Sequence, residues 1–150
     1  MPPDADVLYL KAELALHQKN TKDYRKALEQ AVQADPTHLM AAKSFADLLA
    51  VEKNYSQSIR VLVQTRAAHP RDANLLHKLG NVYYLNGDLP RAVENLENAL
   101  RYEKNSAALY FDLARVYEKM GKTSHSSAML QKAVEIDPAF RNRLLFPEAK

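Results

Sequence analysis

Apolar and small residues between residues 73 and 106 recur with the spacing of two amphipathic helices. The first set is spaced by three, one and three residues, which places it on one helix face: Leu76, Leu79, Gly80 and Tyr83. The second set lies along one face of a following helix: Ala92, Leu96 and Ala99. Asn86-Gly87-Asp88 separates the two sets, and Asp88 is a residue type that favours the N-cap of a helix. The pattern therefore predicts a helical hairpin.

The hairpin pattern repeats with a period of 34 residues. Pro36 and Pro70 are 34 residues apart, and Pro138 follows Pro70 after two such periods. This spacing predicts four consecutive blocks without insertions, which are residues 5–38, 39–72, 73–106 and 107–140. Each block is expected to form two helices, with small residues where the two approach closely.

The interiors of the other blocks follow the same pattern to different degrees. The fourth block matches it through Tyr110, Leu113, Ala114, Tyr117, Ser126, Leu130 and Ala133. The second block matches it through Ala42, Phe45, Ala46, Leu49, Ser58, Leu62 and Thr65. The first block fits least, because Lys11 stands where a large apolar residue is expected and Tyr24 where a small one is. It is interpreted as a terminal repeat adapted to an exposed end, with a slipped register of its first helix as the alternative.

The order large, large, small, aromatic on the first helix and small, large, small on the second, followed by proline, resembles the tetratricopeptide repeat. The resemblance extends over residues 5–140. It implies an all-α fold, in which four helix-turn-helix repeats and their eight helices stack into a right-handed superhelical solenoid. The first helices would line its concave side. A single hairpin cannot bury its own apolar face, so neighbouring repeats are expected to share stability.

Residues 141–150 follow the last complete repeat. Leu144, Leu145 and Phe146 are apolar and suit a lid over the final helix. A fifth repeat is not expected, because Pro147 would break its first helix. We therefore interpret this segment as a short C-terminal cap, with a truncated continuation or a self-association edge as alternatives.

Composition supports a globular helical protein and excludes several functional classes. Hydrophobic residues make up 47% of the chain, charged residues 26%, and only three residues are glycine, which disfavours turn-rich β folds. The absence of cysteine excludes disulfides and thiolate metal sites. Neither a signal peptide nor a membrane-spanning stretch is evident. The default expectation is a cytoplasmic chain without membrane insertion, or a periplasmic one if it is an excised domain.

Catalysis, metal binding and nucleic-acid binding are not expected from the motifs. The five histidines show no metal-ligand spacing, and the chain has no phosphate-binding glycine loop or nucleophile motif. The net charge is only +3, and no block exceeds +2, so a basic stripe that could neutralise phosphates is absent. We therefore predict no enzymatic activity, no cofactor, no metal and no nucleic-acid partner.

The resemblance implies a binding groove formed by the first helices, through positions that the repeat core does not need. The residues at these positions are Lys43, Asp47, His77, Lys78, Asn81, Tyr84, Phe111, Asp112, Arg115 and Glu118. Asn81 can hold a peptide backbone through both its donor and its acceptor. Tyr84 and Phe111 offer flat anchors, and Lys43, Lys78 and Arg115 can pair with acidic side chains. The alternative is a solvated face with local ion pairs, such as Lys43 with Asp47.

Two functions follow from this interpretation. The first is a protein–protein interaction scaffold that binds a peptide segment or helix in its groove. The second is a self-associating structural module that uses its ends, its convex face or residues 141–150. Members of the family that bind chaperone tails grip a C-terminal carboxylate with a lysine and asparagine clamp. This chain does not reproduce the clamp, and Asp47 and Asp112 would repel a carboxylate, so binding of such tails is not expected.

Overall fold

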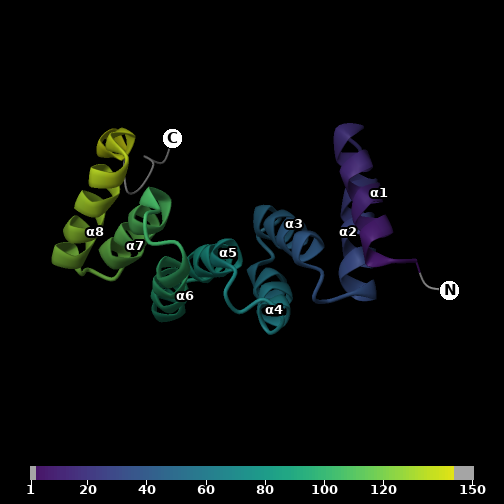
Figure 1. Ribbon diagram of the computed structural model, residues 1–150, viewed down its shortest axis with the longest axis horizontal. Helices are drawn as coiled ribbons and strands as arrows, with labels where there is room; N and C mark the ends of the chain where they lie inside the picture. The colour runs from purple at the N-terminus through teal and green to yellow at the C-terminus, as the bar shows by residue number, and fades with distance from the viewer. Residues whose placement is uncertain (1–2, 144–150) are drawn as a thin grey trace. The chain divides into compact units, whose positions relative to one another are not determined.

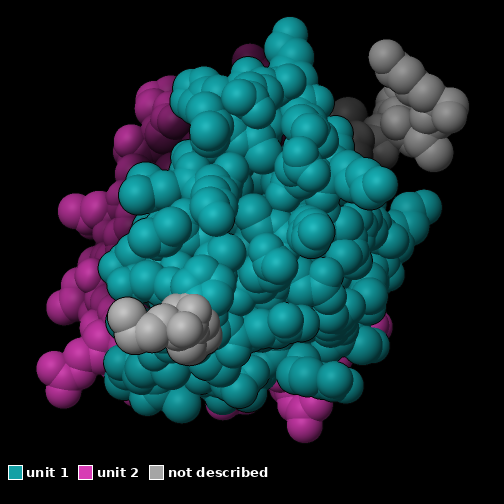
Figure 2. All heavy atoms as spheres, turned by 90° about the vertical axis from the view of Figure 1, so that its right-hand side faces the viewer, with its two compact units in different colours: residues 1–70 teal, residues 71–150 magenta. Residues whose placement is uncertain are grey.

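The computed structural model describes residues 3–143, and this part of the chain consists of α-helices, one short 3-10 helix and their connections (Figure 1). The helices are α1 (Ala5–His17), α2 (Thr21–Ala34), α3 (Leu39–Val51), α4 (Tyr55–Arg66), α5 (Ala73–Leu85), α6 (Leu89–Tyr102), α7 (Ala107–Lys119), α8 (Thr123–Ile136) and the 3-10 helix η1 (Pro138–Asn142). They form two compact units, residues 1–70 and 71–150, coloured separately in Figure 2. The predicted all-α fold of helical hairpins is confirmed.

Side chains at the N-caps determine where most helices begin. From α1 to α7, each cap side chain accepts a hydrogen bond from a backbone N–H in the first turn. These caps are Asp4, Asn20, His38, Asn54, Asp72, Asp88 and Ser106. The predicted cap Asp88 accepts from the N–H of Arg91 at 3.2 Å. Lys122, before α8, makes no side-chain cap bond.

The turn inside each hairpin passes through one residue in the left-handed backbone region. The four residues are 34 positions apart and have φ angles of 55°, 61°, 85° and 74°: Lys19, Lys53, Gly87 and Gly121. Glycine adopts this conformation without steric cost, whereas a side chain with a Cβ is disfavoured there. The first two repeats therefore carry backbone strain that the last two avoid.

This difference predicts opposite effects of substitution at equivalent turns. Lys53→Gly is expected to raise the free energy of unfolding, and Gly87→Ala to lower it, each by about 1 kcal/mol. A Cβ at Gly87 would meet no atom within 4 Å, so the expected loss comes from the backbone and not from a clash. Urea titrations followed by circular dichroism measure both changes. If both substitutions changed the free energy of unfolding in the same direction, the explanation by backbone strain would be contradicted.

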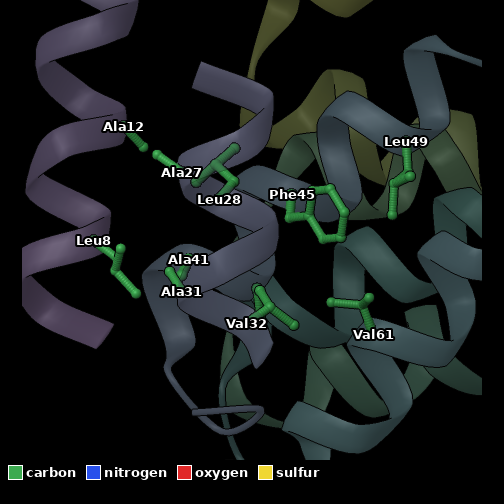
Figure 3. Close-up of a cluster of buried hydrophobic side chains, with 11 residues drawn as sticks. Leu8, Ala12, Ala27, Leu28, Ala31, Val32, Ala41, Phe45, Leu49 and Val61 are labelled. Atoms are coloured by element: carbon green, nitrogen blue, oxygen red, sulfur yellow. The ribbon is translucent and has the colours of Figure 1, made fainter. Parts of the chain in front are cut away.

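The core of unit 1 lies between its two hairpins and joins α1, α2, α3 and α4 (Figure 3). Its buried residues include Leu8, Ala12, Leu28, Ala31, Phe45, Leu49 and Val61. Leu8 and Ala12 occupy the positions that Leu76 and Gly80 occupy in the third repeat, and both are buried, while Lys11 is exposed. The first helix is therefore in the unshifted register, and a slipped register is excluded.

In unit 2 the two helices of the third repeat approach closely at a glycine. A Cβ built on Gly80 would lie 2.7 Å from Cγ of Leu96 and 3.3 Å from the carbonyl oxygen of Ala92. Leu96 is fully buried in this contact. The small residue that the sequence pattern places at this position is thus required by the packing of α6 against α5.

An aromatic contact closes the last repeat. The ring of Phe140, in η1, lies with its centroid 5.3 Å from that of Phe111 in α7, and both residues are buried with Ala107 and Ala133. The guanidinium of Arg143 lies 4.1 Å from the Phe140 ring centroid. The predicted lid residues Leu144, Leu145 and Phe146 lie outside the described residues. Within the described part, it is Phe140 that covers this end of α7.

Candidate functional site

Three side chains from α5 and α7 converge on the carboxylate of Asp112. His77 contributes Nε2 at 2.6 Å from Oδ2, and Asn81 donates from Nδ2 to the same oxygen at 3.1 Å. Arg115, one turn further along α7, donates from Nη1 to Oδ1 at 3.3 Å. The Asp112 side chain is only 15% exposed. The first helices of the last two repeats are therefore joined by a largely buried polar cluster.

The helical spacing explains why these residues meet. His77 and Asn81 are four residues apart and project from one face of α5. Asp112 and Arg115 are three residues apart and share a face of α7. The contact of α5 with α7 brings the two faces together.

The cluster keeps the Asp112 carboxylate ionised. Burial alone would raise its pKa, because it disfavours the charged form. The hydrogen bond and charge interaction with His77, the hydrogen bond from Asn81 and the charge of Arg115 outweigh burial, and they hold the pKa of Asp112 below its ordinary value. A fixed negative charge thus lies between two helices, surrounded by donors.

Next to this cluster, two cations lie over one aromatic ring. The guanidinium carbon of Arg115 is 4.9 Å from the ring centroid of Tyr84, and Nζ of Lys119 is 4.8 Å from it. Both distances fall within the range of cation–π attraction, which contributes about 0.5–1 kcal/mol at exposed sites. The ring itself is buried. Asp112 and Tyr84 therefore hold Arg115 from two sides.

The structure brings together five of the predicted groove residues in unit 2: His77, Asn81, Tyr84, Asp112 and Arg115. Two expectations about exposed aromatic anchors need correction. Phe111 is buried against Phe140 and belongs to the core of the last repeat. Tyr84 does lie beside the predicted residues, but the residue is only 8% exposed, so it supports Arg115 and is not itself an open surface.

The four remaining predicted residues lie on α3, α5 and α7. Lys78 on α5 and Glu118 on α7 are half-buried. Lys43 and Asp47 belong to α3 of unit 1, where Lys43 is half-buried and Asp47 is exposed. Sequence reasoning missed Lys119, although its position four residues after Arg115 places it on the same face of α7.

Unit 1 contains a second histidine–carboxylate pair, at the start of α3. Nδ1 of His38 accepts a hydrogen bond from the N–H of Ala41 at 3.1 Å, and Nε2 lies 2.8 Å from Oδ1 of Asp6. Because Nδ1 accepts, the ring proton belongs on Nε2, where it can be donated to Asp6. This pair links the N-cap of α3 to the first turn of α1. We therefore interpret it as a structural contact and not as a functional site.

Within residues 3–143, no three histidine or carboxylate side chains are arranged to hold a metal ion. The helices in that same range are also too short or too polar to cross a bilayer.

Comparison with protein families decides the identity of the repeats. Family models described as tetratricopeptide repeat match residues 6–38, 43–94 and 107–140, and one described as TPR repeat matches residues 80–121. The chain belongs to the tetratricopeptide-repeat family. The sequence resemblance is thereby confirmed in all four repeats.

Three curated relatives are 25% to 29% identical to this tetratricopeptide-repeat chain over the aligned residues. The "Hsp70-Hsp90 organizing protein" of Triticum aestivum is 27% identical over 127 residues, or 85% of this chain. "Tetratricopeptide repeat protein 1" of Schizosaccharomyces pombe is 29% identical over 77% of the chain, and "Cellulose synthase operon protein C" of Pseudomonas fluorescens is 25% identical over 96%. The chain spans only 21%, 12% and 12% of the lengths of these three relatives.

Solved structures of MamA share the fold. "MamA 41-end" from Desulfovibrio magneticus superposes with a TM-score of 0.80 over 91% of this chain and 77% of that one, at 19% identity. "Crystal structure of MamA protein" gives a TM-score of 0.82 over 91% and 74%, at 17% identity. At this identity the likeness concerns the fold alone. Family membership and the curated relatives support a protein–protein interaction scaffold.

Proposed function

We propose that the chain is a non-catalytic adaptor that binds an extended, acidic peptide segment of a partner protein across α5 and α7. The observation that carries the proposal is the Asp112 cluster. It fixes Asn81 and Arg115 on neighbouring helices before any partner is bound. Side chains that are already held in place lose little entropy on binding, and this favours affinity.

The chemistry of the cluster favours a partner with hydrogen-bonding backbone and carboxylate groups. An asparagine amide can pair with both the N–H and the C=O of a peptide, and an arginine guanidinium matches a carboxylate. Lys119 of α7 adds a second positive charge over the Tyr84 ring that Arg115 also contacts. An open Asp112 would repel a carboxylate, as the sequence suggested, but here its carboxylate is enclosed by His77, Asn81 and Arg115. Its role in this proposal is to orient these donors.

Selection from a library of displayed random peptides tests the proposal. Wild-type protein is expected to enrich peptides that contain aspartate or glutamate. Binding of a selected peptide should weaken at least about tenfold, or about 1.4 kcal/mol, in the double variant Asn81→Ala/Arg115→Ala. Fluorescence anisotropy of the labelled peptide measures this change.

Substitutions of the same residue types on α6 provide the control. Asn98→Ala/Arg101→Ala removes one asparagine and one arginine from a second helix and should leave peptide affinity unchanged. Equal loss in both double variants, or selection of peptides without acidic residues, would overturn the proposed site. A chaperone-type tail peptide provides a further comparison. We expect no micromolar binding of it, because the clamp residues are absent.

A further inference from the structure

Helix α1 carries a second apolar stripe that faces away from the core. Val7, Leu10 and Leu14 follow one another at steps of three and four residues, and they are 47%, 65% and 58% exposed. The residues that α1 buries in unit 1 are different ones: Ala5, Leu8, Ala12 and Ala15. With 3.6 residues per turn, the two sets lie on opposite sides of the helix. Figure 2 views unit 1 from the side on which α1 and α2 lie.

The equivalent positions in other repeats show that the stripe is particular to α1. Leu10 corresponds to Ser44, Lys78 and Asp112, which are all polar. Val7 and Leu14 correspond to Leu109 and Val116 of α7, which are buried on a helix that packs against α6. Within this chain, a neighbouring helix therefore covers that side of a first helix. On α1 the same side is apolar and exposed.

We infer that the stripe pairs two copies of this chain, with their α1 helices side by side and parallel. Val7, Leu10 and Leu14 occupy successive a, d and a positions of a heptad, which is the spacing that joins two helices along a narrow apolar seam. The proposal goes beyond peptide binding, because the stripe lies on α1 of unit 1 and the candidate site on α5 and α7 of unit 2.

Charges beside the stripe favour a second copy in the parallel orientation. In heptad terms Asp6 and Glu13 occupy g positions on one flank, and Lys11 occupies an e position on the other. A parallel pair brings Asp6 of one copy near Lys11 of the other, and symmetry repeats this contact. An antiparallel pair would bring Lys11 near Lys11 and Glu13 near Glu13. Like charges disfavour that arrangement.

The expected dimer is weak. Three apolar side chains per copy bury less surface than a permanent interface needs, so dissociation in the micromolar range or above is expected. The average molecular mass from sedimentation equilibrium should therefore rise from that of a monomer towards that of a dimer as the protein concentration increases about a hundredfold.

Substitutions with a matched control test the stripe. Leu10→Gln/Leu14→Gln should keep the protein monomeric over the whole concentration range. Leu16→Gln/Leu85→Gln removes two leucines that are half exposed elsewhere and should leave the concentration dependence unchanged. Circular dichroism should show the same helix content in all three proteins. A monomeric wild type, or a stripe variant that associates like wild type, would overturn the inference.

A disulfide cross-link tests the orientation. The chain contains no cysteine, so a single introduced thiol can form a disulfide only with the same thiol of a second copy. In a parallel pair, residue 10 faces residue 10, so Leu10→Cys should form a covalent dimer under mild oxidation, and Leu16→Cys should not. Equal cross-linking of the two variants, or stronger cross-linking of Leu16→Cys, would overturn the parallel arrangement. So would a Lys11→Glu variant that associates more strongly than wild type.

Discussion

Replacing Leu96 with alanine should lower the free energy of unfolding by about 3 kcal/mol. Leu96 is fully buried in the third repeat, and it contacts the one position on α5 where the structure has no Cβ, at Gly80. Truncation removes buried methyl groups and leaves a cavity between two helices that already carry small residues. Because α6 also contacts α7, the loss is expected to weaken both the third repeat and its packing against the fourth.

The same residue type at the equivalent position of the last repeat provides a control. Leu130 of α8 is only partly buried, so Leu130→Ala is expected to cost clearly less than Leu96→Ala. Exposed Leu85 gives the lower limit, and Leu85→Ala should change stability by less than about 0.5 kcal/mol. Urea denaturation measured at two wavelengths gives the three values. Equal losses for Leu96 and Leu130 would contradict the role of burial.

A double-mutant cycle examines the contact itself. A Cβ at Gly80 would lie 2.7 Å from Cγ of Leu96, so Gly80→Ala alone forces a fully buried side chain to move. In the Leu96→Ala background that obstacle is gone, and the added methyl group fills part of the cavity. Gly80→Ala should therefore be more favourable by about 1 kcal/mol in that background than in wild type. Additive effects would show that the two sites are not coupled.

The repeat period made the helices predictable, because each helix is determined by local signals that recur every 34 residues. Asp88 is an N-cap, as its place before the second apolar set predicts. Gly87 and Gly121 adopt the left-handed conformation that a short helix–helix turn requires. The left-handed Lys19 and Lys53 could not be predicted from residue preference, and only the 34-residue register relates them to the glycines.

The candidate site was only partly predictable, because its contacts depend on how repeats pack. Helical spacing places His77 and Asn81 on one face of α5. Their hydrogen bonds with Asp112, however, depend on how α7 packs against α5. The burial of Phe111 depends on Phe140, which lies beyond the last α-helix and outside the repeat signature. Because Phe140 is not part of the repeat pattern, its contact with Phe111 could not be predicted from the spacing of the repeat residues.

Replacing Asp112 with asparagine should lower the free energy of unfolding at neutral pH by about 2 kcal/mol. Asparagine keeps the shape of the side chain but removes the charge that His77, Asn81 and Arg115 surround. Its amide group also directs N–H donors towards neighbours that are themselves donors. Glu94→Gln neutralises an exposed carboxylate on α6 and should change stability by less than about 0.5 kcal/mol.

The difference between wild type and Asp112→Asn should depend on pH. Because the pKa of Asp112 is lower in the folded protein than in the unfolded chain, its carboxylate adds stability above the unfolded value of 3.8. This contribution is lost as the pH falls through 3.8 and then through the lower pKa of the folded state. The two unfolding free energies should therefore differ most near neutral pH and converge in acid.

Comparing the two proteins isolates Asp112 from other groups that titrate in acid. Two hydrogen bonds from Thr37, one from its side chain and one from its backbone N–H, lower the pKa of Asp35, which contributes equally to both proteins. Urea titrations at a series of pH values from neutral to about pH 3 give the difference directly. A difference that stays constant over this range would mean that the Asp112 charge does not stabilise the fold. The contact between α5 and α7 would then have to be stabilised by packing and other uncharged interactions.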